Sequence, residues 1–276
     1  MQRAGEVETE QLTLFREMDK GAPCVVSCSF GKDSLASAIV ALETGMNVQR
    51  IIFCHVMFDE GISAEMPEQE RFIFDTAIPY FRNRYGVETE IIHPAMTVVE
   101  HFYKVRQDGK NAGQIYGWPT LRGCWVNSNI KLRAIKKWKR SNPGLLEVVG
   151  IAADEEERVV RKTVAGKVLV LNEQGYTERD AAEICARRGL LPPIYSVDRP
   201  RTGCWFCQMQ RTSQLAELRH KHPELWARML EMDKDSPFPF KYRGTVRDYE
   251  RRLAEADDDA AFWERVRAIN EASGCE

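Results

Sequence analysis

The sequence lacks several features that would place the protein at a membrane or outside the cell. No run of about 18 apolar residues, the length that a helix needs to cross a bilayer, is present. The first residues, MQRAGEVETEQL, do not contain the apolar segment of a secretory signal peptide. The formal net charge is only −2, so overall charge predicts neither a nucleic-acid nor a membrane partner. We therefore expect a cytoplasmic protein.

The composition is that of an ordinary globular chain, without an internal repeat or a low-complexity tract. Of the 276 residues, 43% are hydrophobic and 29% are charged. This length accommodates one large α/β domain and a small appendage. We expect the large domain to span residues 1–200 and a helical C-terminal region to span residues 201–276.

The stretch from Cys24 to Ser34, CVVSCSFGKDS, predicts an anion site. Its first five residues are small or β-branched, as in a buried parallel strand, and residues 35–43 have the composition of a helix packed on a sheet. A helix N-terminus after a Ser/Gly turn presents unpaired N–H groups and the positive end of the helix dipole. Ser29, Ser34 and Lys32 add further donors, so we expect this loop to bind phosphate. The chain has no GxxxxGK[ST] motif.

Further strands alternate with helical segments and predict a doubly wound, mostly parallel sheet. The expected strands are residues 50–57, 87–93, 145–151 and 168–171. His55 and Asp59 follow the carboxyl end of the second strand, where ligands bind in such sheets, and are candidates for contacts to a base or a ribose. A structural histidine and a capping aspartate are equally good interpretations. Helical segments alone are expected after residue 207.

Eight cysteines are many for a chain in a reducing compartment, and they divide into two groups. Cys24, Cys28 and Cys54 lie in apolar runs and are expected in the core. The spacing of Cys204 and Cys207 allows both thiolates to reach one metal centre, as in zinc and iron–sulfur sites. Two further cysteines would complete a four-thiolate set, and burial without a metal is the alternative. The expected ligands are Cys124, Cys185, Cys204 and Cys207.

Two motifs resemble those of known enzymes. Ser29-Phe30-Gly31-Lys32-Asp33-Ser34 resembles the SGGxDS loop of the PP-loop ATP pyrophosphatases, and its Ser-Phe-Gly resembles the corresponding loop of the sulfonucleotide reductases. The GCWFC segment at residues 203–207 and the helix-forming sequence after it resemble the C-terminal half of proteins in the phosphoadenosine phosphosulfate reductase-like superfamily, near its DNA-phosphorothioation and phage-borne members.

This resemblance implies a Rossmann-like PP-loop domain that binds ATP with Mg²⁺. It implies that Lys32 neutralises the phosphates and that Asp33 helps to hold the metal ion. It also implies a [4Fe–4S] cluster on the four cysteines, with zinc as the alternative. The implied nucleotide-binding residues are Ser27, Ser29, Phe30, Gly31, Lys32, Asp33, Ser34, His55, Asp59, Gly150, Glu155 and Arg158.

The implied reaction is cleavage of ATP to AMP and pyrophosphate, which activates a substrate for sulfur transfer. A sulfonucleotide reductase that releases sulfite and a non-catalytic nucleotide-binding module are the alternatives. The tail lacks the ECG[LI]H motif of the reductases, but Cys275 could act as a nucleophile or persulfide carrier, unless it is an ordinary tail cysteine. The basic segment at residues 127–140 is either a contact surface for nucleic acid or an ordinary solvated helix face. A protein that relays sulfur is the other candidate partner.

Overall fold

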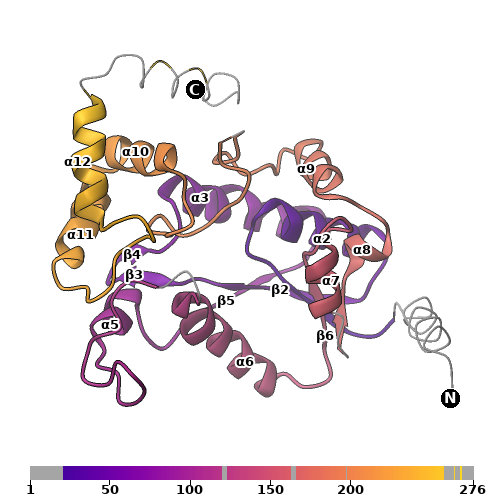
Figure 1. Ribbon diagram of the computed structural model, residues 1–276. Coiled ribbons are helices and arrows are strands. Elements are labelled where there is room, and N and C mark those ends of the chain that lie inside the picture. The colour runs from indigo at the N-terminus through magenta and orange to yellow at the C-terminus, as the bar shows by residue number, and fades with distance from the viewer. Residues whose placement is uncertain are drawn as a thin grey trace, which may run out of the picture. The chain divides into compact units, whose positions relative to one another are not determined.

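The computed structural model describes residues 21–119, 123–162, 166–196 and 198–257, together with Glu264 and Ala268 (Figure 1). The chain forms two compact units that alternate along the sequence. Unit 1 contains Met1–Phe53, Tyr80–Glu90 and Asn142–Gly189, and unit 2 contains Cys54–Pro79, Ile91–Ser141 and Leu190–Glu276. The expected domain boundary at residue 200 stays a prediction, and Cys275 lies outside the described residues.

A five-stranded sheet forms the centre of unit 1. The last residue of β2 and the last two residues of β5 belong to unit 2 instead. Strand β1 pairs in parallel with β2 and β6, and β6 pairs in parallel with β7. The Ile51 amide of β2 donates to the Glu88 carbonyl, and the His55 amide, just after β2, donates to the Ile92 carbonyl of β5. Strand β5 therefore runs in the same direction as β2. The order is β5-β2-β1-β6-β7, which confirms the predicted α/β class; the strands are Thr89–Ile92, Val48–Cys54, Cys24–Ser27, Leu146–Val149 and Lys167–Val168.

The strand order reverses at β1. The chain first builds outward through β2 to β5, and then returns to place β6 on the other side of β1. Val26 is in register with Ile51 of β2 and with Val148 of β6. In open α/β sheets, ligands bind beyond the carboxyl ends of the strands at such a reversal. The loop after β1 therefore lies at the expected binding position.

Helix α2, Lys32–Glu43, packs on β1 and β6 through a nearly continuous buried surface of Leu, Ile, Val and Ala. It also contacts the helices α8 and α9 of unit 1, and Gly45, directly after the C-cap Thr44, has a φ of 77°, as is common where a helix ends. The strand predicted over residues 168–171 is wrong beyond Val168, because the next residues turn into a short helix. The other helices are α7 Glu156–Lys162, α8 Val170–Glu173 and α9 Glu178–Ala186.

The helical segment around Pro79 is interrupted before the proline. A π-helical turn covers Ile73–Ala77, and Pro79 is the second residue of the following helix, where its missing N–H is tolerated. The helices on either side are α3 Pro67–Phe72 and α4 Ile78–Tyr85. A small antiparallel pair precedes them, with β3 at Met57–Asp59 and β4 at Ile62–Ser63.

The rest of unit 2 is helical. Capping boxes at Thr97 and Thr177 begin two of the chain's helices, and Thr245 exchanges equivalent hydrogen bonds with Asp248. The side chains of Trp118 and Trp205 are fully buried in the unit 2 core. Within the described residues, no helix is long and apolar enough to cross a membrane. The remaining elements are α5 Val98–Tyr103, the π-turn Val126–Lys131, α6 Leu132–Ser141, α10 Thr212–Lys221, α11 Pro223–Asp233 and α12 Val246–Asp257.

Candidate functional site

The loop between β1 and α2 has an unusual backbone at Phe30. This residue has a φ of 55°, a left-handed conformation that non-glycine residues adopt uncommonly. Its ring is fully buried and lies edge-on to Phe53, with 5.2 Å between ring centroids. The Phe30 amide donates to the sulfur of Cys28 over 3.4 Å. The core packing of Phe30 therefore accompanies a sharp turn that directs the loop to the N-terminus of α2.

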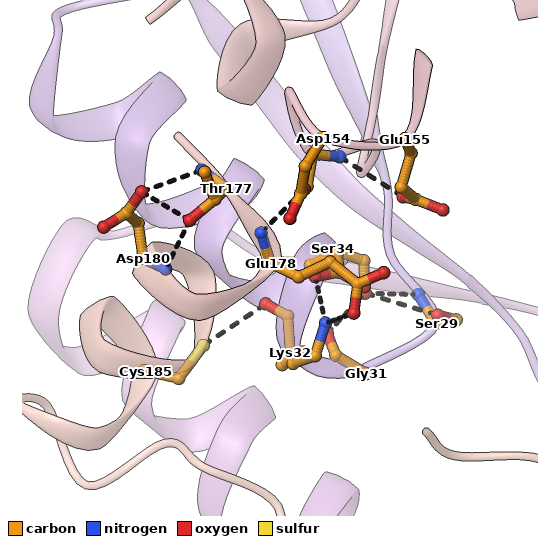
Figure 2. Close-up of polar contacts among 12 residues, drawn as sticks. Ser29, Gly31, Lys32, Ser34, Asp154, Glu155, Thr177, Glu178, Asp180 and Cys185 are labelled. Carbon is orange, nitrogen blue, oxygen red and sulfur yellow. Dashed lines mark hydrogen bonds and ion pairs between the residues drawn. The ribbon is translucent and has the colours of Figure 1, made fainter. Parts of the chain in front are cut away.

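The predicted serines shape this loop from within. The Ser34 hydroxyl accepts a hydrogen bond from the Ser29 amide at 3.1 Å and donates to the Gly31 carbonyl at 2.9 Å (Figure 2). The Ser29 and Ser34 hydroxyl oxygens are 3.3 Å apart. Ser27 instead donates to the buried carboxylate of Glu147 on β6, over 2.7 Å. Its predicted contact with the nucleotide stays a prediction.

Gly150 brings the end of β6 against the first turn of α2. A Cβ atom at this position would lie 2.6 Å from the Cα and N atoms of Ser34, a separation that real Cβ contacts essentially never have. The close approach therefore requires glycine. Gly150 therefore lies beside the loop between β1 and α2, and its predicted role in nucleotide binding stays a prediction.

Lys32 is held between two carboxylates. Its ammonium donates to Asp33 at 2.7 Å and to Glu178, on the first turn of α9, at 2.8 Å (Figure 2). Burial alone would lower the pKa of Lys32, but the hydrogen bonds and charges of both carboxylates outweigh it and raise the pKa above its ordinary value. Lys32 is thus a nearly buried cation at the N-terminus of α2.

Acidic side chains gather around this cation. Burial raises the pKa of Asp33, Lys32 opposes this shift, and the nearby charges of Glu178 and Glu155 add to it. Glu155 accepts from the Ala152 amide at 3.3 Å and forms an ion pair with Arg158. The predicted residues Glu155 and Arg158 are therefore paired with each other, and Glu155 is close enough to Asp33 to interact electrostatically. Carboxylate oxygens are the ligands that Mg²⁺ prefers, but as they stand these side chains do not form a group that could hold a metal ion, which is true of all the described residues.

His55 and Asp59 are engaged within unit 2. The Nε2 atom of His55 lies 2.9 Å from the Ser63 hydroxyl and 3.0 Å from a Glu70 carboxylate oxygen. Burial lowers the pKa of His55, although Glu70 opposes this. Asp59 forms an ion pair with Arg228 of α11. These contacts are those of structural residues, and a role for either residue in nucleotide binding stays a prediction.

Cys185 belongs to unit 1. Its thiol is fully buried and donates to the Lys32 carbonyl over 3.3 Å (Figure 2). Burial raises the pKa of this thiol to about 12. Cys24, Cys28 and Cys54 are also buried, which confirms their expected place in the core.

The other three predicted ligands belong to unit 2. Cys204 lies in a β-bridge with Glu65, and the Trp205 amide donates to the Ala64 carbonyl at 3.1 Å, which fixes the start of the CxxC segment. The Cys207 amide donates to the Cys204 carbonyl at 3.0 Å, closing the turn. Burial raises the pKa of both thiols, and Cys124 interacts electrostatically with each. The structure thus brings Cys124, Cys204 and Cys207 into one neighbourhood, which we call the cysteine trio.

Charged side chains adjoin the cysteine trio. Lys131 and Glu65 interact electrostatically with Cys204, and Lys241 and Arg201 do so with Cys207. Among the described residues, no three His, Cys, Asp or Glu side chains are close enough together to hold a metal ion as they stand. Cys124 is exposed, whereas the other two thiols are less accessible. Metal binding by the trio therefore requires the Cys124 side chain to approach the CxxC segment.

Comparisons with known proteins find matches among solved structures only. No protein family and no curated protein matches the chain. Among solved structures, it is similar to the U34-tRNA thiolase NcsA from Methanococcus maripaludis with its [4Fe–4S] cluster, at 16% identity and a TM-score of 0.42. The likeness covers 91% of this chain and 81% of that chain. Functional assignments for this chain rest on its own residues.

Sequence reasoning did not identify three acidic residues of these sites. Glu178 follows the capping residue Thr177, but a capping box does not indicate that the next side chain reaches Lys32. Glu147 sits in an apolar strand, and a charge at the centre of such a strand was the available signal. No sequence feature indicated Glu65, because its pairing with Cys204 is a β-bridge between segments that are far apart in the sequence.

Proposed function

We propose that the protein binds ATP on the loop from Cys28 to Ser34 and cleaves it to AMP and pyrophosphate, which activates a substrate for sulfur transfer. The observation that carries the proposal is the position of Lys32. It lies at the N-terminus of α2, at the reversal of strand order, next to a carboxylate group and to the close approach of Gly150. This arrangement suits a polyphosphate with a divalent cation.

Different residues around the loop would contact the phosphates and the cation of the bound nucleotide. First-turn N–H groups of α2 would donate to phosphate oxygens, and the close approach of Gly150 to the Ser34 backbone would hold this turn in place. Phosphates would take over the Lys32 ammonium from Asp33 and Glu178. The two carboxylates would then be free to bind the cation that accompanies the nucleotide, with Glu155 beside them.

The proposed reaction has two balanced steps. A carbon-bound oxygen of the substrate forms a bond to the α-phosphorus of ATP, and pyrophosphate leaves with the electron pair of the broken phosphorus–oxygen bond. Hydrosulfide then forms a bond to the substrate carbon, AMP leaves with the oxygen, and a proton passes to solvent. No electron is gained or lost overall. Lys32 would stabilise the charge that develops on the phosphates in the first step.

The cysteine trio would hold an iron–sulfur cluster, with zinc as the alternative. Three soft thiolate donors fit either group, and the buried rings of Trp205 and Phe206 exclude water from the CxxC segment. Such a group supplies a site at which sulfur can bind. This chain's residues would fix the ligands: the Glu65 bridge holds Cys204, and Gln210 donates to the Cys204 carbonyl over 3.1 Å. The three-cysteine set replaces the four-ligand set in this proposal, because the Cys185 thiol is bonded within unit 1.

Pyrophosphate release tests the proposal. The purified protein, with ATP, Mg²⁺, sulfide and unmodified RNA or DNA, should form AMP and pyrophosphate in equal amounts. Lys32→Gln should lower the rate about 100-fold, because a preorganised charge on the phosphates is lost. Lys110→Gln, at an exposed loop position, is the matched control and should leave the rate unchanged.

Two results would contradict the proposal. Sulfite formation from adenosine phosphosulfates, without pyrophosphate from ATP, would identify a sulfonucleotide reductase. ATP binding that is never followed by cleavage with any nucleic acid or protein substrate would identify a non-catalytic nucleotide-binding module.

A further inference from the structure

Helix α6 carries an exposed cationic face in unit 2. Residues 126–141, which form the π-turn and α6, contain no Asp or Glu. Trp138 and Ile130 are buried and attach the segment to the core. Within the described part of the chain, four exposed cations of α6 form no ion pair with an acidic side chain. We call them the α6 cations: Arg133, Lys136, Lys137 and Arg140.

A tight turn before α12 exposes an aromatic ring beside another cation. The Lys241 amide donates to the Gly244 carbonyl at 3.0 Å, and the Gly244 amide donates to the Lys241 carbonyl at 3.1 Å. Tyr242 at the tip is 85% exposed, and Arg243 is exposed next to it. A single exposed ring is common on protein surfaces, but its flat face is available for a partner to stack on. Because the turn is closed on both sides, the ring is presented by a rigid element.

Both elements begin next to residues that interact with the cysteine trio. Lys131, which directly precedes α6, interacts electrostatically with Cys204. Lys241, which opens the turn, does so with Cys207, and its ammonium donates to the Gln210 carbonyl. Lys131 and Lys241 thus place the start of α6 and the start of the turn near the CxxC segment, where Gln210 also donates to the Cys204 carbonyl at 3.1 Å.

We infer that unit 2 binds a single-stranded segment of nucleic acid, with its phosphates on the α6 cations and a base stacked on Tyr242. Separated cations match the repeated charge of a phosphate backbone, and an exposed ring offers the flat surface on which unpaired bases stack. A phosphate-only ligand would use the cations and leave the ring without a role. The inference rests on the proposed function for the chemistry at the trio, but binding itself requires neither ATP nor a metal.

Fluorescence anisotropy with labelled 20-nucleotide single-stranded RNA and DNA, and with the matching duplexes, measures this binding. The double variant K136Q/K137Q should bind about 25-fold more weakly at 0.1 M salt, because each lost phosphate contact contributes about 0.7 to the logarithmic salt slope of a single strand. The slope itself should fall by about 1.4. The control R179Q/R187Q removes two exposed arginines from α9 of unit 1, for the same change in charge, and should bind as the unchanged protein does.

Tyr242 separates base recognition from charge attraction. Tyr242→Ala should weaken binding of single strands about tenfold, the ordinary loss for one base stack, with an unchanged salt slope. Tyr242→Phe keeps the ring and should restore binding. The ratio of RNA to DNA affinity then identifies the natural nucleic acid. These exposed side chains lie outside the core, and circular dichroism checks that each variant is folded.

Four results would overturn the inference. Equal weakening by the α6 and α9 variants would show general charge attraction. Equal competition by poly-glutamate of matched charge would identify an acidic protein as the occupant. Preference for duplexes, or no effect of Tyr242→Ala, would exclude base stacking. Binding without pyrophosphate release would leave this inference standing while the proposed function fails, and pyrophosphate release without binding would do the reverse.

Discussion

The two units hold their candidate sites in opposite ways. In unit 1, Ser29, Gly31 and Ser34 are already bonded to one another, and Lys32 is already paired. In unit 2, the cysteine trio is a neighbourhood of thiols that is not yet in a ligating arrangement within the described residues. A phosphate site can be assembled from backbone groups and a helix end, whereas a metal site needs several side chains to converge. A phosphate site can therefore be complete before its ligand binds, whereas a metal site takes its final arrangement only when the metal is bound.

The two sites also differ in how the sequence encodes them. The phosphate loop is one continuous stretch, completed by Gly150 and Glu178 from later segments. The cysteine trio and its charged neighbours come from segments around residues 65, 124, 131, 204 and 241. Substitutions that act on one unit alone therefore test whether the two sites are independent.

Removal of a trio cysteine should have the largest effect. Cys204→Ala should abolish metal binding, because two thiols alone hold such a group poorly, while ATP binding in unit 1 should persist. Iron, zinc and acid-labile sulfide analysis of anaerobically purified protein measures the first, and calorimetry measures the second. The matched variant Cys185→Ala should retain the metal and lose about 1 kcal/mol of stability, the ordinary cost of a small core truncation. Loss of metal in Cys185→Ala would instead restore the four-ligand set.

Gly150→Ala should have the next largest effect, in unit 1. The added Cβ would lie 2.6 Å from the Ser34 backbone, so the first turn of α2 must shift. We expect ATP to bind about 100-fold more weakly, since overpacking costs about 1–3 kcal/mol and displaces the loop. Gly203→Ala is the control, because its Cβ would meet no atom within 4 Å. Equal losses in both variants would show that the Gly150 contact is not what shapes the loop.

The pH dependence of Mg–ATP binding should reveal the partly buried carboxyl of Asp33. Burial raises its pKa, so in acid it takes up a proton at a higher pH than an ordinary aspartate and stops binding the cation. Affinity should fall by up to about tenfold per pH unit below that pKa. A profile that Asp33→Asn leaves unchanged would assign the titration to another group.

Folding stability should respond to Asp33 in the opposite sense. A carboxyl with a raised folded-state pKa binds its proton more tightly in the folded chain than in the unfolded chain. Its contribution to stability is therefore greatest below the unfolded pKa and is lost as the pH rises through the folded pKa. Denaturation of the wild type and of Asp33→Asn across this range measures the difference.

Loss of a helix cap should have the smallest effect. Thr177→Ala removes the capping box of α9, whose first residue is Glu178, and Thr97→Ala removes that of α5 in unit 2. Each should cost about 1 kcal/mol of stability. Thr177→Ala alone should also weaken ATP binding, by about threefold, because the carboxylate that positions Lys32 is less firmly held. Equal ATP affinities in the two variants would mean that Glu178 does not need this cap.

The sequence predicts the elements of the fold more fully than the details of the sites. Apolar runs and capping boxes predict most strands and helices, because both depend on neighbouring residues. The prediction is wrong at residues 169–171, where a strand-like run of Leu and Val forms the start of α8 instead. The cause is tertiary, because Val170 and Leu171 are buried as a helical turn, and α8 packs on α2. Such contacts are not encoded locally.

The same limit applies to individual site residues. Lys32, Asp33 and Gly150 are predictable because a continuous motif and a strand end place them. The Lys32–Glu178 ion pair is not, because 146 positions separate its partners and many acidic residues could equally serve. Cys185 illustrates the converse, since the sequence groups it with the other cysteines, whereas in the structure its buried thiol donates to the Lys32 carbonyl; its place in a metal site stays a prediction.

Phe30 has a consequence for how ligand affinity is distributed. A glycine at this position would let the loop sample many backbone conformations, and binding would have to restrict them. The Phe30 ring is buried against Phe53, so the loop is restricted when the protein folds, before any nucleotide arrives. The loop therefore loses its conformational entropy once, when the chain folds, and not again each time a ligand binds. The loop should therefore bind with a smaller entropic penalty and a faster approach to its final geometry than a glycine-based loop of the same shape.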